Sequence, residues 1–397
     1  MTNKNTHILF FCSWFKTPDN KIIGSFFEEQ ARMLLKRGYK VGIINPEFES
    51  QFFGNSRFKK KKEVFNFVDD GLPIYYSRTQ SIIPKYENLN YIDLHRFYYE
   101  GFLAYKSYVT DYGKPDIIHA QSVLYAGILA RKISLKERIP YVVSEHFSKL
   151  ILDSRFSLEN TLINKMIIKT YKEAHALFSV SNFLKEKLVK NFNLDCSDVV
   201  VLPNIVNDFF FKNTKVKLDK DYFVITVLAN LIELKNHITL FKAIKILIAN
   251  NLKIRLNVVG NGPVLNNLVL FIEKNNLENS IILMGFKSRK EVQEIIRNSH
   301  CLISASLFET FGVNLIEALA VGRPVIAYDS GGPRDIIRDF NGLLVSDNTP
   351  EAFVKSIIKL KNNYENYNQE AISKDCENRF SESVIFNKLI KFYSRIN

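Results

Sequence analysis

The sequence predicts an α/β protein of two domains, each built on a parallel β-sheet, and three observations support this fold class. Short apolar runs of strand length alternate with longer helical segments from one end of the chain to the other. A polar stretch rich in Asn and Lys interrupts this alternation at residues 204–220, and the pattern then restarts. At 397 residues, the chain is also too long for one ordinary core, so two domains of roughly 200 residues are expected.

The first half contains the elements of one complete sheet. Apolar runs predict about six strands, at residues 7–13, 40–45, 116–120, 140–144, 177–180 and 199–202. Helical patterns separate them, at residues 26–36, 123–131 and within 158–174. The first helix closes at Gly38, because glycine is favoured just beyond a helix end.

The second half repeats the arrangement. Strands are predicted at residues 222–229, 255–259, 281–284, 301–304 and 324–328, and helices at 237–250, 264–275, 290–298 and 315–320. Two similar α/β halves leave a cleft between them. Ligands of such sheets bind at the carboxyl ends of the strands, so we expect the active site in that cleft.

The C-terminal segment reads as a separate amphipathic helix. Its apolar residues recur at helical spacing, with these candidate buried positions: Val384, Phe386, Leu389, Ile390 and Tyr393. The expected organisation is a first domain at residues 1–205, a second at 206–380 and a C-terminal helix at 381–397 that crosses back to the first domain.

Composition places the chain among soluble globular proteins, with 46% hydrophobic and 24% charged residues. The four cysteines fit no metal spacing and read as reduced thiols of a cytoplasmic protein. Apolar runs all fall short of the ~18 residues that a membrane span needs. Residues 7–12 are followed by Lys16 and Pro18 without a cleavage site, which favours a first strand over a signal peptide.

The net charge of +13 narrows the classes of partner. An excess of basic over acidic residues suits binding to an anionic membrane surface, a nucleotide or nucleic acid. The densest run, at residues 59–62, is equally well explained as a solvated loop. A nucleic-acid-binding protein is the weaker alternative, because the chain has no helix-turn-helix, zinc-finger or RNA-recognition motif.

Residues 306–327 are the most informative part of the chain. They place Glu309 and Glu317 around Gly312, which can open a helix, and Gly322 supplies the helix stop before a buried strand. A loop followed by a helix N-terminus is a place to hold phosphate, since free backbone N–H groups and the positive end of the helix dipole point at the ligand.

Two more glycine-bearing turns lie in the same half. Gly260 and Gly262 follow one strand, and the turn at residues 330–334 follows another. Each turn alone is equally consistent with a tight structural connection, and the first lacks the third glycine of a dinucleotide fingerprint. Three such strand-to-helix turns in one domain favour a ligand that carries phosphate.

These residues resemble the GT-B glycosyltransferases of the retaining family 4, and the likeness extends over nearly the whole chain. The E-x7-E signature of that family corresponds to Glu309 and Glu317, and the sequence Ala-Leu-Ala-Val-Gly-Arg-Pro-Val that follows is also typical. Residues 179–181, 201–204, 260–263 and 331–332 match further family motifs. The resemblance implies two Rossmann-like domains that face each other across a cleft.

The resemblance also implies a role for each matching residue. Glu317 would hold the ribose of a nucleotide-sugar donor, UDP- or GDP-linked, and Glu309 would contact the sugar hydroxyls. The amides of Phe311, Gly312 and Val313 would line the sugar and phosphate pocket.

Three more roles concern the diphosphate and the first domain. Lys235 would neutralise the diphosphate leaving group, while Gly24 would lie near the diphosphate and the acceptor. His146 would face the donor sugar, although a buried, hydrogen-bonded histidine at a strand end is its structural alternative.

One position departs from the family pattern. Many members carry an arginine five residues before the lysine, where this chain has Asn230. An amide cannot neutralise a diphosphate, so Arg334 or Lys287 is a candidate replacement, and a non-catalytic nucleotide-sugar-binding relative is an alternative function. No paired-aspartate metal motif is evident, so we expect a metal-independent reaction that needs no cofactor.

The acceptor is expected to be a glycan or a lipid-linked glycan, as in bacterial surface polysaccharide or lipopolysaccharide synthesis. The aromatic, basic segment 96–106 would suit peripheral docking on the inner face of the cytoplasmic membrane. A helix that packs its aromatic side chains inward explains the same segment.

Overall fold

A computed structural model describes residues 6–16, 24–50, 63–81, 91–146, 150, 162–211 and 216–396. The chain forms two compact units. The first unit contains residues 1–180, 185–202 and 386–397, and the second contains 181–184 and 203–385. Residues 203–385 therefore make up most of the second unit, and the last residues of the chain belong to the first unit.

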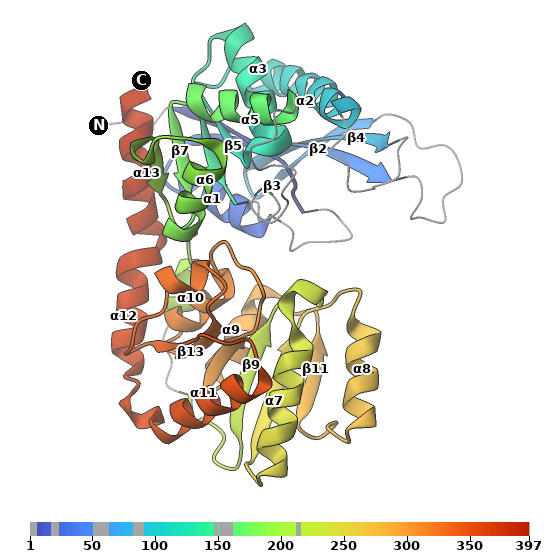
Figure 1. The fold of residues 1–397 in the computed structure, drawn as a ribbon. Helices are drawn as coiled ribbons and strands as arrows, with labels where there is room; N and C mark the ends of the chain where they lie inside the picture. The colour runs from blue at the N-terminus through green and yellow to red at the C-terminus, as the bar shows by residue number, and fades with distance from the viewer. Residues whose placement is uncertain are drawn as a thin grey trace. The chain divides into compact units, whose positions relative to one another are not determined.

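The first unit is built on a sheet of eight strands in the order β3-β4-β2-β1-β5-β6-β7-β8 (Figure 1). Every neighbouring pair is parallel except β3 and β4. The strands are β1 (His7–Cys12), β2 (Lys40–Ser50), β3 (Glu63–Asp69), β4 (Leu72–Ser81), β5 (Ile117–Gln121), β6 (Tyr141–Glu145), β7 (Ala176–Ser179) and β8 (Val199–Val201).

The prediction of about six strands missed the hairpin of β3 and β4. Asp70 and Gly71 form its two-residue turn, with φ of 47° and 78°. Two consecutive residues at positive φ make the turn that best matches the twist of paired strands, and Asp-Gly is a favoured sequence for it. The signal for the hairpin was therefore present in the sequence.

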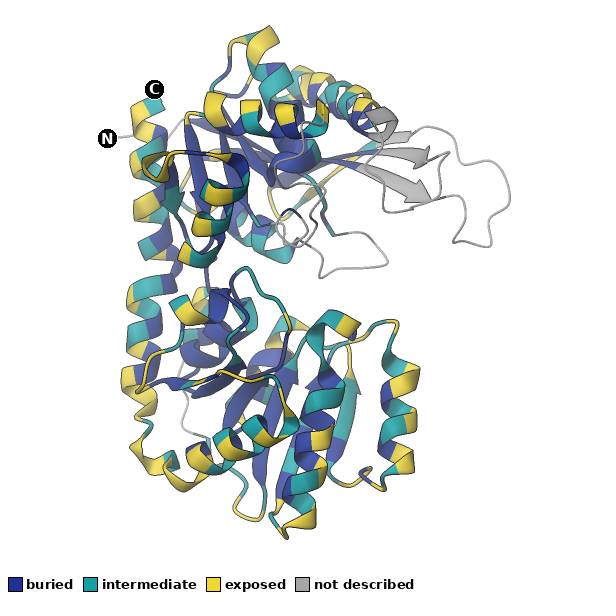
Figure 2. Ribbon diagram, viewed as in Figure 1, coloured by how far each residue is buried: buried dark blue, intermediate teal, exposed yellow. Residues whose placement is uncertain are grey.

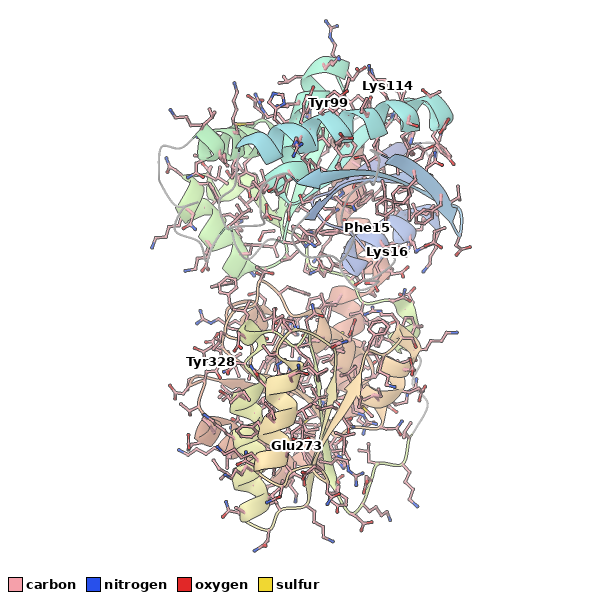
Figure 3. The ribbon with its side chains drawn as sticks, turned by 90° about the vertical axis from the view of Figure 1, so that its right-hand side faces the viewer. Phe15, Lys16, Tyr99, Lys114, Glu273 and Tyr328 are labelled. Atoms are coloured by element: carbon pink, nitrogen blue, oxygen red, sulfur yellow. The ribbon has the colours of Figure 1, made fainter. Side chains whose placement is uncertain are left out.

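Helices cover both faces of this sheet. They are α1 (Ser25–Leu35), α2 (Tyr91–Tyr112), α3 (Ile128–Glu137), α5 (Leu162–Glu173) and α6 (Asn182–Phe192). Segment 96–106 lies within α2, which buries Phe97, Tyr105 and Tyr108 and leaves Tyr99 52% exposed (Figure 3). Much of its aromatic surface is thus directed inward.

The second unit is built on six parallel strands in the order β11-β10-β9-β12-β13-β14. They are β9 (Phe223–Leu228), β10 (Ile254–Val259), β11 (Ile281–Gly285), β12 (Cys301–Ser304), β13 (Val325–Tyr328) and β14 (Gly342–Val345). The first five lie where the sequence predicted strands, and β14 is an additional edge strand.

Six helices flank this second sheet: α7 (His237–Ala249), α8 (Leu265–Lys274), α9 (Arg289–Arg297), α10 (Val313–Ala320), α11 (Pro350–Asn362) and α12 (Gln369–Phe380). Apolar side chains of α7, α8 and α11 share one core with the strands. Figure 2 shows this layering: the strands are buried (dark blue), and the helices beside them expose their outer sides (yellow). The sequence analysis did not assign α11 and α12.

The C-terminal helix α13 (Glu382–Ile396) confirms two of its predicted core positions and corrects three. Leu389 and Tyr393 are fully buried, whereas Val384, Phe386 and Ile390 are only half-buried. Ile385, which was not predicted, is fully buried. Ile385, Leu389 and Tyr393 recur every four residues and so lie on one helical face, of which Ile385 belongs to the second unit and the other two residues to the first. Within the described residues, the helices are all too short or too polar to cross a membrane.

Candidate functional site

The residues of the E-x7-E motif lie at the carboxyl end of the second sheet. Glu309 follows β12 and pairs with Gly331, which follows β13, through the backbone bond from the Gly332 amide to the Glu309 carbonyl (2.9 Å). The Glu309 carboxylate forms an ion pair with Lys235, at the end of a short 3-10 turn (Glu233–Lys235) that follows β9. The site is thus assembled from loops that follow adjacent strands.

Gly312 and Glu317 occupy the start and middle of α10. Gly312 is the N-cap with φ of 121°, and no side chain caps this helix end. Glu317 is buried in the helix and forms an ion pair with Arg289, the first residue of α9. The Arg289 guanidinium also lies over the Phe210 ring, 5.1 Å from its centroid. Burial of Glu317 is compatible with its charge because Arg289 supplies a cation.

The two glycines after β10 bring two loops into contact. A Cβ on Gly260 would overlap the Ala229 carbonyl oxygen, and one on Gly262 would overlap that of Leu231. The Leu231 amide donates to the Asn261 carbonyl at 2.9 Å. The loop after β9, which carries Asn230 and Lys235, is therefore held directly against this turn.

The glycine loop after β13 packs against the start of α10 in the same way. A Cβ on Gly332 would overlap the Phe311 backbone, while the Phe311 ring packs inward against Phe380 at 5.7 Å between centroids. Val313 is the first residue of α10. The structure therefore gathers the predicted second-domain residues at one edge of the sheet.

The two candidate replacements for the missing arginine are engaged elsewhere. Arg334 forms an ion pair with Asp329, and Lys287 forms one with Glu291 at 3.5 Å. Arg289 is the cation that meets the motif, at Glu317. Sequence reasoning did not identify Arg289, since its only distinguishing feature there is its place at the start of a helix.

Two predicted residues of the first unit are brought together by α1. Gly24 caps α1 in the left-handed conformation, with φ of 72°. Phe26 and Phe27 follow it, and each ring centroid lies 5.0 Å from that of His146, which follows β6. Burial lowers the pKa of His146 to about 3, so its imidazole is uncharged at neutral pH. The same surroundings also fit the alternative for His146, which is a buried, hydrogen-bonded histidine at a strand end with a structural role.

Comparison with known proteins identifies the family. A family profile described as Glycosyltransferase Family 4 matches residues 23–208, and one described as Glycosyl transferases group 1 matches residues 208–374. The structure resembles sucrose-phosphate synthase from Thermosynechococcus elongatus, with a TM-score of 0.75, 14% identity and coverage of 98% and 99% of the two chains. The chain is a GT-B glycosyltransferase of family 4.

Two sequence relatives match this glycosyltransferase over part of its length. An uncharacterized glycosyltransferase of Methanocaldococcus jannaschii is 28% identical over 63% of this chain and 66% of its own length, just under two thirds. The Escherichia coli UDP-Gal:alpha-D-GlcNAc-diphosphoundecaprenol alpha-1,3-galactosyltransferase is 24% identical over 67% of this chain and 70% of its own.

Two further structures share the fold of the glycosyltransferase. Anabaena HepE in complex with UDP has a TM-score of 0.71 at 15% identity, over 98% of this chain and 100% of HepE. The lipopolysaccharide outer core galactosyltransferase WaaB has a TM-score of 0.65 at 18% identity, over 98% and 99% of the two chains. At these identities, the similarity concerns the fold alone.

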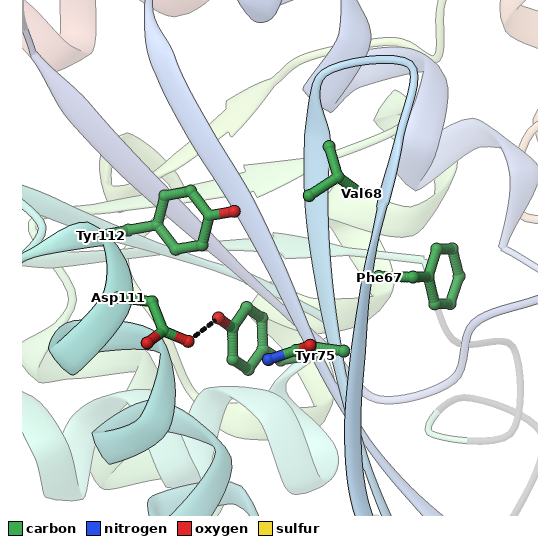
Figure 4. Close-up of a pocket in the computed structure, with 6 residues that line it drawn as sticks. Phe67, Val68, Tyr75, Asp111 and Tyr112 are labelled. Carbon is green, nitrogen blue, oxygen red and sulfur yellow. Dashed lines mark hydrogen bonds between the residues drawn. The ribbon is translucent and has the colours of Figure 1, made fainter.

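The first unit of the glycosyltransferase also has a pocket away from the predicted residues. Its volume is about 290 Å³, and it is lined by Asn66, Phe67, Val68, Tyr75, Asp111 and Tyr112 (Figure 4). The Tyr75 hydroxyl donates to the Asp111 carboxylate, and burial raises the pKa of Tyr75. The pocket lies near the amino ends of the parallel strands, opposite the edge where His146 follows β6.

A resident metal site was not expected in the glycosyltransferase. Among the residues that the structure describes, no group of three or more His, Cys, Asp and Glu side chains could hold a metal ion. The expected independence from metals and cofactors stays a prediction.

Proposed function

We propose that this glycosyltransferase moves a hexose, with retention of configuration, from a UDP- or GDP-sugar to a glycan or lipid-linked glycan. One observation carries the proposal: both carboxylates of the E-x7-E motif lie with their cations at the carboxyl edge of one sheet. Hydroxyl-binding carboxylates beside phosphate-binding cations are the chemistry that a nucleotide sugar requires.

A uridine nucleotide is the favoured donor within this proposal. The structural neighbour HepE is described in complex with UDP, and the Escherichia coli relative is named for a UDP-galactose donor. The acceptor of that relative is linked to diphosphoundecaprenol, and WaaB is named for the lipopolysaccharide outer core. We therefore place the chain in bacterial surface polysaccharide or lipopolysaccharide synthesis.

The proposed reaction follows from the charges that develop. Cleavage of the sugar–phosphate bond creates positive charge on the sugar ring and negative charge on the departing diphosphate. Lys235 and the uncapped start of α10 stabilise the diphosphate, with Asn230 adding no charge. The acceptor hydroxyl attacks from the face that the diphosphate leaves, and a departing phosphate oxygen takes its proton, which retains the anomeric configuration.

A nucleotide-release assay tests the enzyme against its closest alternative. The protein is incubated with UDP- and GDP-sugars and candidate acceptors, with EDTA present in a parallel set. Release that persists in EDTA and is lost in Lys235→Ala supports the proposal. Tight donor binding without turnover on any acceptor would instead indicate a non-catalytic relative, as Asn230 would allow.

We further propose that α2 and α3 touch the inner face of the cytoplasmic membrane. Tyr99 and Leu135 are exposed on these helices, and the Lys132 ammonium lies 4.1 Å from the Tyr98 ring centroid. Aromatic and aliphatic side chains beside lysines suit anionic lipid headgroups. The site chemistry does not depend on this contact.

Vesicle sedimentation tests the membrane contact. Recovery with anionic vesicles should exceed recovery with neutral ones, and the double change Tyr99→Ser and Leu135→Ser should reduce the difference. Leu270→Ser is the matched control, since Leu270 is equally exposed but lies in the second unit. Equal recovery with both kinds of vesicle would remove the proposal.

A further inference from the structure

Two buried glutamines connect helix α1 to His146. Gln121 is the last residue of β5, and its side-chain Nε2 donates to Oε1 of Gln30 on α1 at 2.8 Å. That bond leaves Gln121 Oε1 to face the histidine, and it lies 2.9 Å from His146 Nε2. An amide oxygen only accepts hydrogen bonds, so His146 Nε2 must carry the hydrogen. The neutral imidazole is thereby the Nε2-protonated tautomer.

The backbone of His146 is fixed by the residue before it. The buried Glu145 carboxylate accepts the His146 amide through Oε1 at 2.9 Å. Its Oε2 accepts the Val123 amide at 2.9 Å and the Tyr171 hydroxyl at 2.8 Å. One carboxylate therefore ties the end of β6 to the start of the turn after β5 and to α5.

The surroundings also keep the His146 ring uncharged. Phe26 and Phe27 pack against it from α1, and that burial is what lowers its pKa. The Glu145 carboxylate bonds the His146 backbone amide, and among the described residues His119 on β5 interacts with the ring; the pKa of His119 is lowered to about 3 by burial and by His146. Gln121 contributes a hydrogen-bond acceptor without a charge.

We propose that Gln121, held by Gln30, is a positioning residue that fixes His146 as the uncharged, Nε2-protonated tautomer, so that the ring stays neutral and exchanges no proton during sugar transfer. The part of this statement that concerns transfer rests on the proposed function. The tautomer and its cause rest on the hydrogen bonds alone. A second-layer amide that fixes the tautomer of a site histidine is a recurring device in proteins.

NMR of protein with ¹⁵N-labelled histidine tests the tautomer directly. The chain has seven histidines, and the His146 signal is the one that His146→Phe removes. We expect Nε2-protonated, neutral His146 from pH 5 to pH 8. In Gln121→Leu, the two tautomers should mix. In Gln121→Glu, a carboxylate beside Nε2 should bring the midpoint of His146 protonation to about pH 5–6.

A matched control and a second variant distinguish loss of the Gln121 hydrogen bond from general unfolding. Gln293→Leu changes an equally buried glutamine of the second unit, whose Nε2 donates to the Phe209 carbonyl, and should leave the His146 signal unchanged. Gln30→Met removes only the hydrogen bond between Gln30 and Gln121, so the two tautomers of His146 should mix less than in Gln121→Leu. An Nδ1-protonated wild type, or an unchanged tautomer in Gln121→Leu, would overturn the proposal.

Kinetics separate this inference from the proposed function. With the best donor of the nucleotide-release assay, Gln121→Glu should add a pH-dependent limb near the new His146 midpoint, which the wild type lacks. A switched tautomer with an unchanged pH profile would refute the part of the proposal that concerns transfer. If the wild type releases no nucleotide from any donor, the proposed function fails while the tautomer result stands.

Discussion

The ammonium of Lys235 contacts the carboxylate of Glu309, although 74 positions separate the two residues in the chain. They meet because Lys235 follows β9 and Glu309 follows β12, and these strands are neighbours in the sheet. Both side chains are largely buried, with 20% and 16% exposed. A sugar diphosphate bound here would find its cation already in place.

Removal of the Lys235 charge should therefore impair transfer more than folding. We expect Lys235→Ala to lower kcat for nucleotide release by about a hundredfold or more, the usual cost of losing one group that stabilises the developing anion. Lys245→Ala is the control, because Lys245 is exposed on the adjacent helix α7 and donates to the Asn275 side chain at 2.8 Å. Equal activity of the two variants would contradict the role of Lys235.

The Arg289–Glu317 pair should respond asymmetrically to loss of each partner. Only 2% of the Glu317 side chain is exposed, against 38% for Arg289. Arg289→Ala leaves a buried carboxylate without this cation, whereas Glu317→Gln leaves a partly solvated guanidinium. We expect the larger fall in Tm for Arg289→Ala, measured by differential scanning fluorimetry.

Nucleotide affinity should show the opposite order. Glu317→Gln should weaken UDP binding by about tenfold or more, since a charged acceptor for the ribose hydroxyls is lost. Titration calorimetry measures the change, and Glu291→Gln on the exposed side of α9 is the control. Unchanged UDP affinity in Glu317→Gln would remove the ribose-binding role.

Two glycines of the second sheet form a matched pair for testing loop packing. Gly260 has φ of 147° and no room for a Cβ, whereas Gly285 has φ of 66° and open space around the same position. An alanine at either position would bear the strain of a positive φ, so Gly285→Ala should cost about 1 kcal/mol. Gly260→Ala should cost several times more, because the Ala229 carbonyl must move. Equal unfolding midpoints in urea would contradict this packing.

The attachment of the C-terminal helix to the first unit depends on a buried hydrogen bond. Tyr393 on α13 lies 2.5 Å from His119 Nδ1, and both residues are fully buried. Tyr393→Phe should destabilise this unit by about 1–3 kcal/mol, because His119 Nδ1 loses its hydrogen-bond partner out of reach of water. Tyr99→Phe, at an exposed position of α2, should have no effect in the same urea titration.

Acid should destabilise the second unit through His300. Burial lowers the pKa of His300 to about 4, from 6.5 in the unfolded chain. Between these values, the unfolded state binds the extra proton, so the contribution of His300 is complete above pH 6.5 and is lost as pH falls toward 4. The slope should approach ~1.4 kcal/mol per pH unit. His300→Gln should reduce the slope of unfolding free energy against pH between 7 and 5, and His237, whose pKa burial also lowers to about 4, should supply a remaining slope.

The sequence by itself determined the α/β alternation, the strands that flank the site and the motif residues. These follow from local patterns, because an apolar run, a glycine-bearing turn and a helix boundary each span only a few neighbouring residues. The Asp70–Gly71 turn was equally local, although the Asp-Gly pair was not used to predict its hairpin. Nothing about it needed tertiary information.

Only the tertiary structure decided which side chains meet. Arg289 reaches Glu317 across 28 positions, and Gln30 reaches Gln121 across 91, because strand order and helix packing bring these elements together. The buried stripe of α13 was decided in the same way, since Ile385 and Tyr393 belong to different units. Side-chain pairing depends on distances between elements far apart in the chain, and no local pattern in the sequence contains those distances.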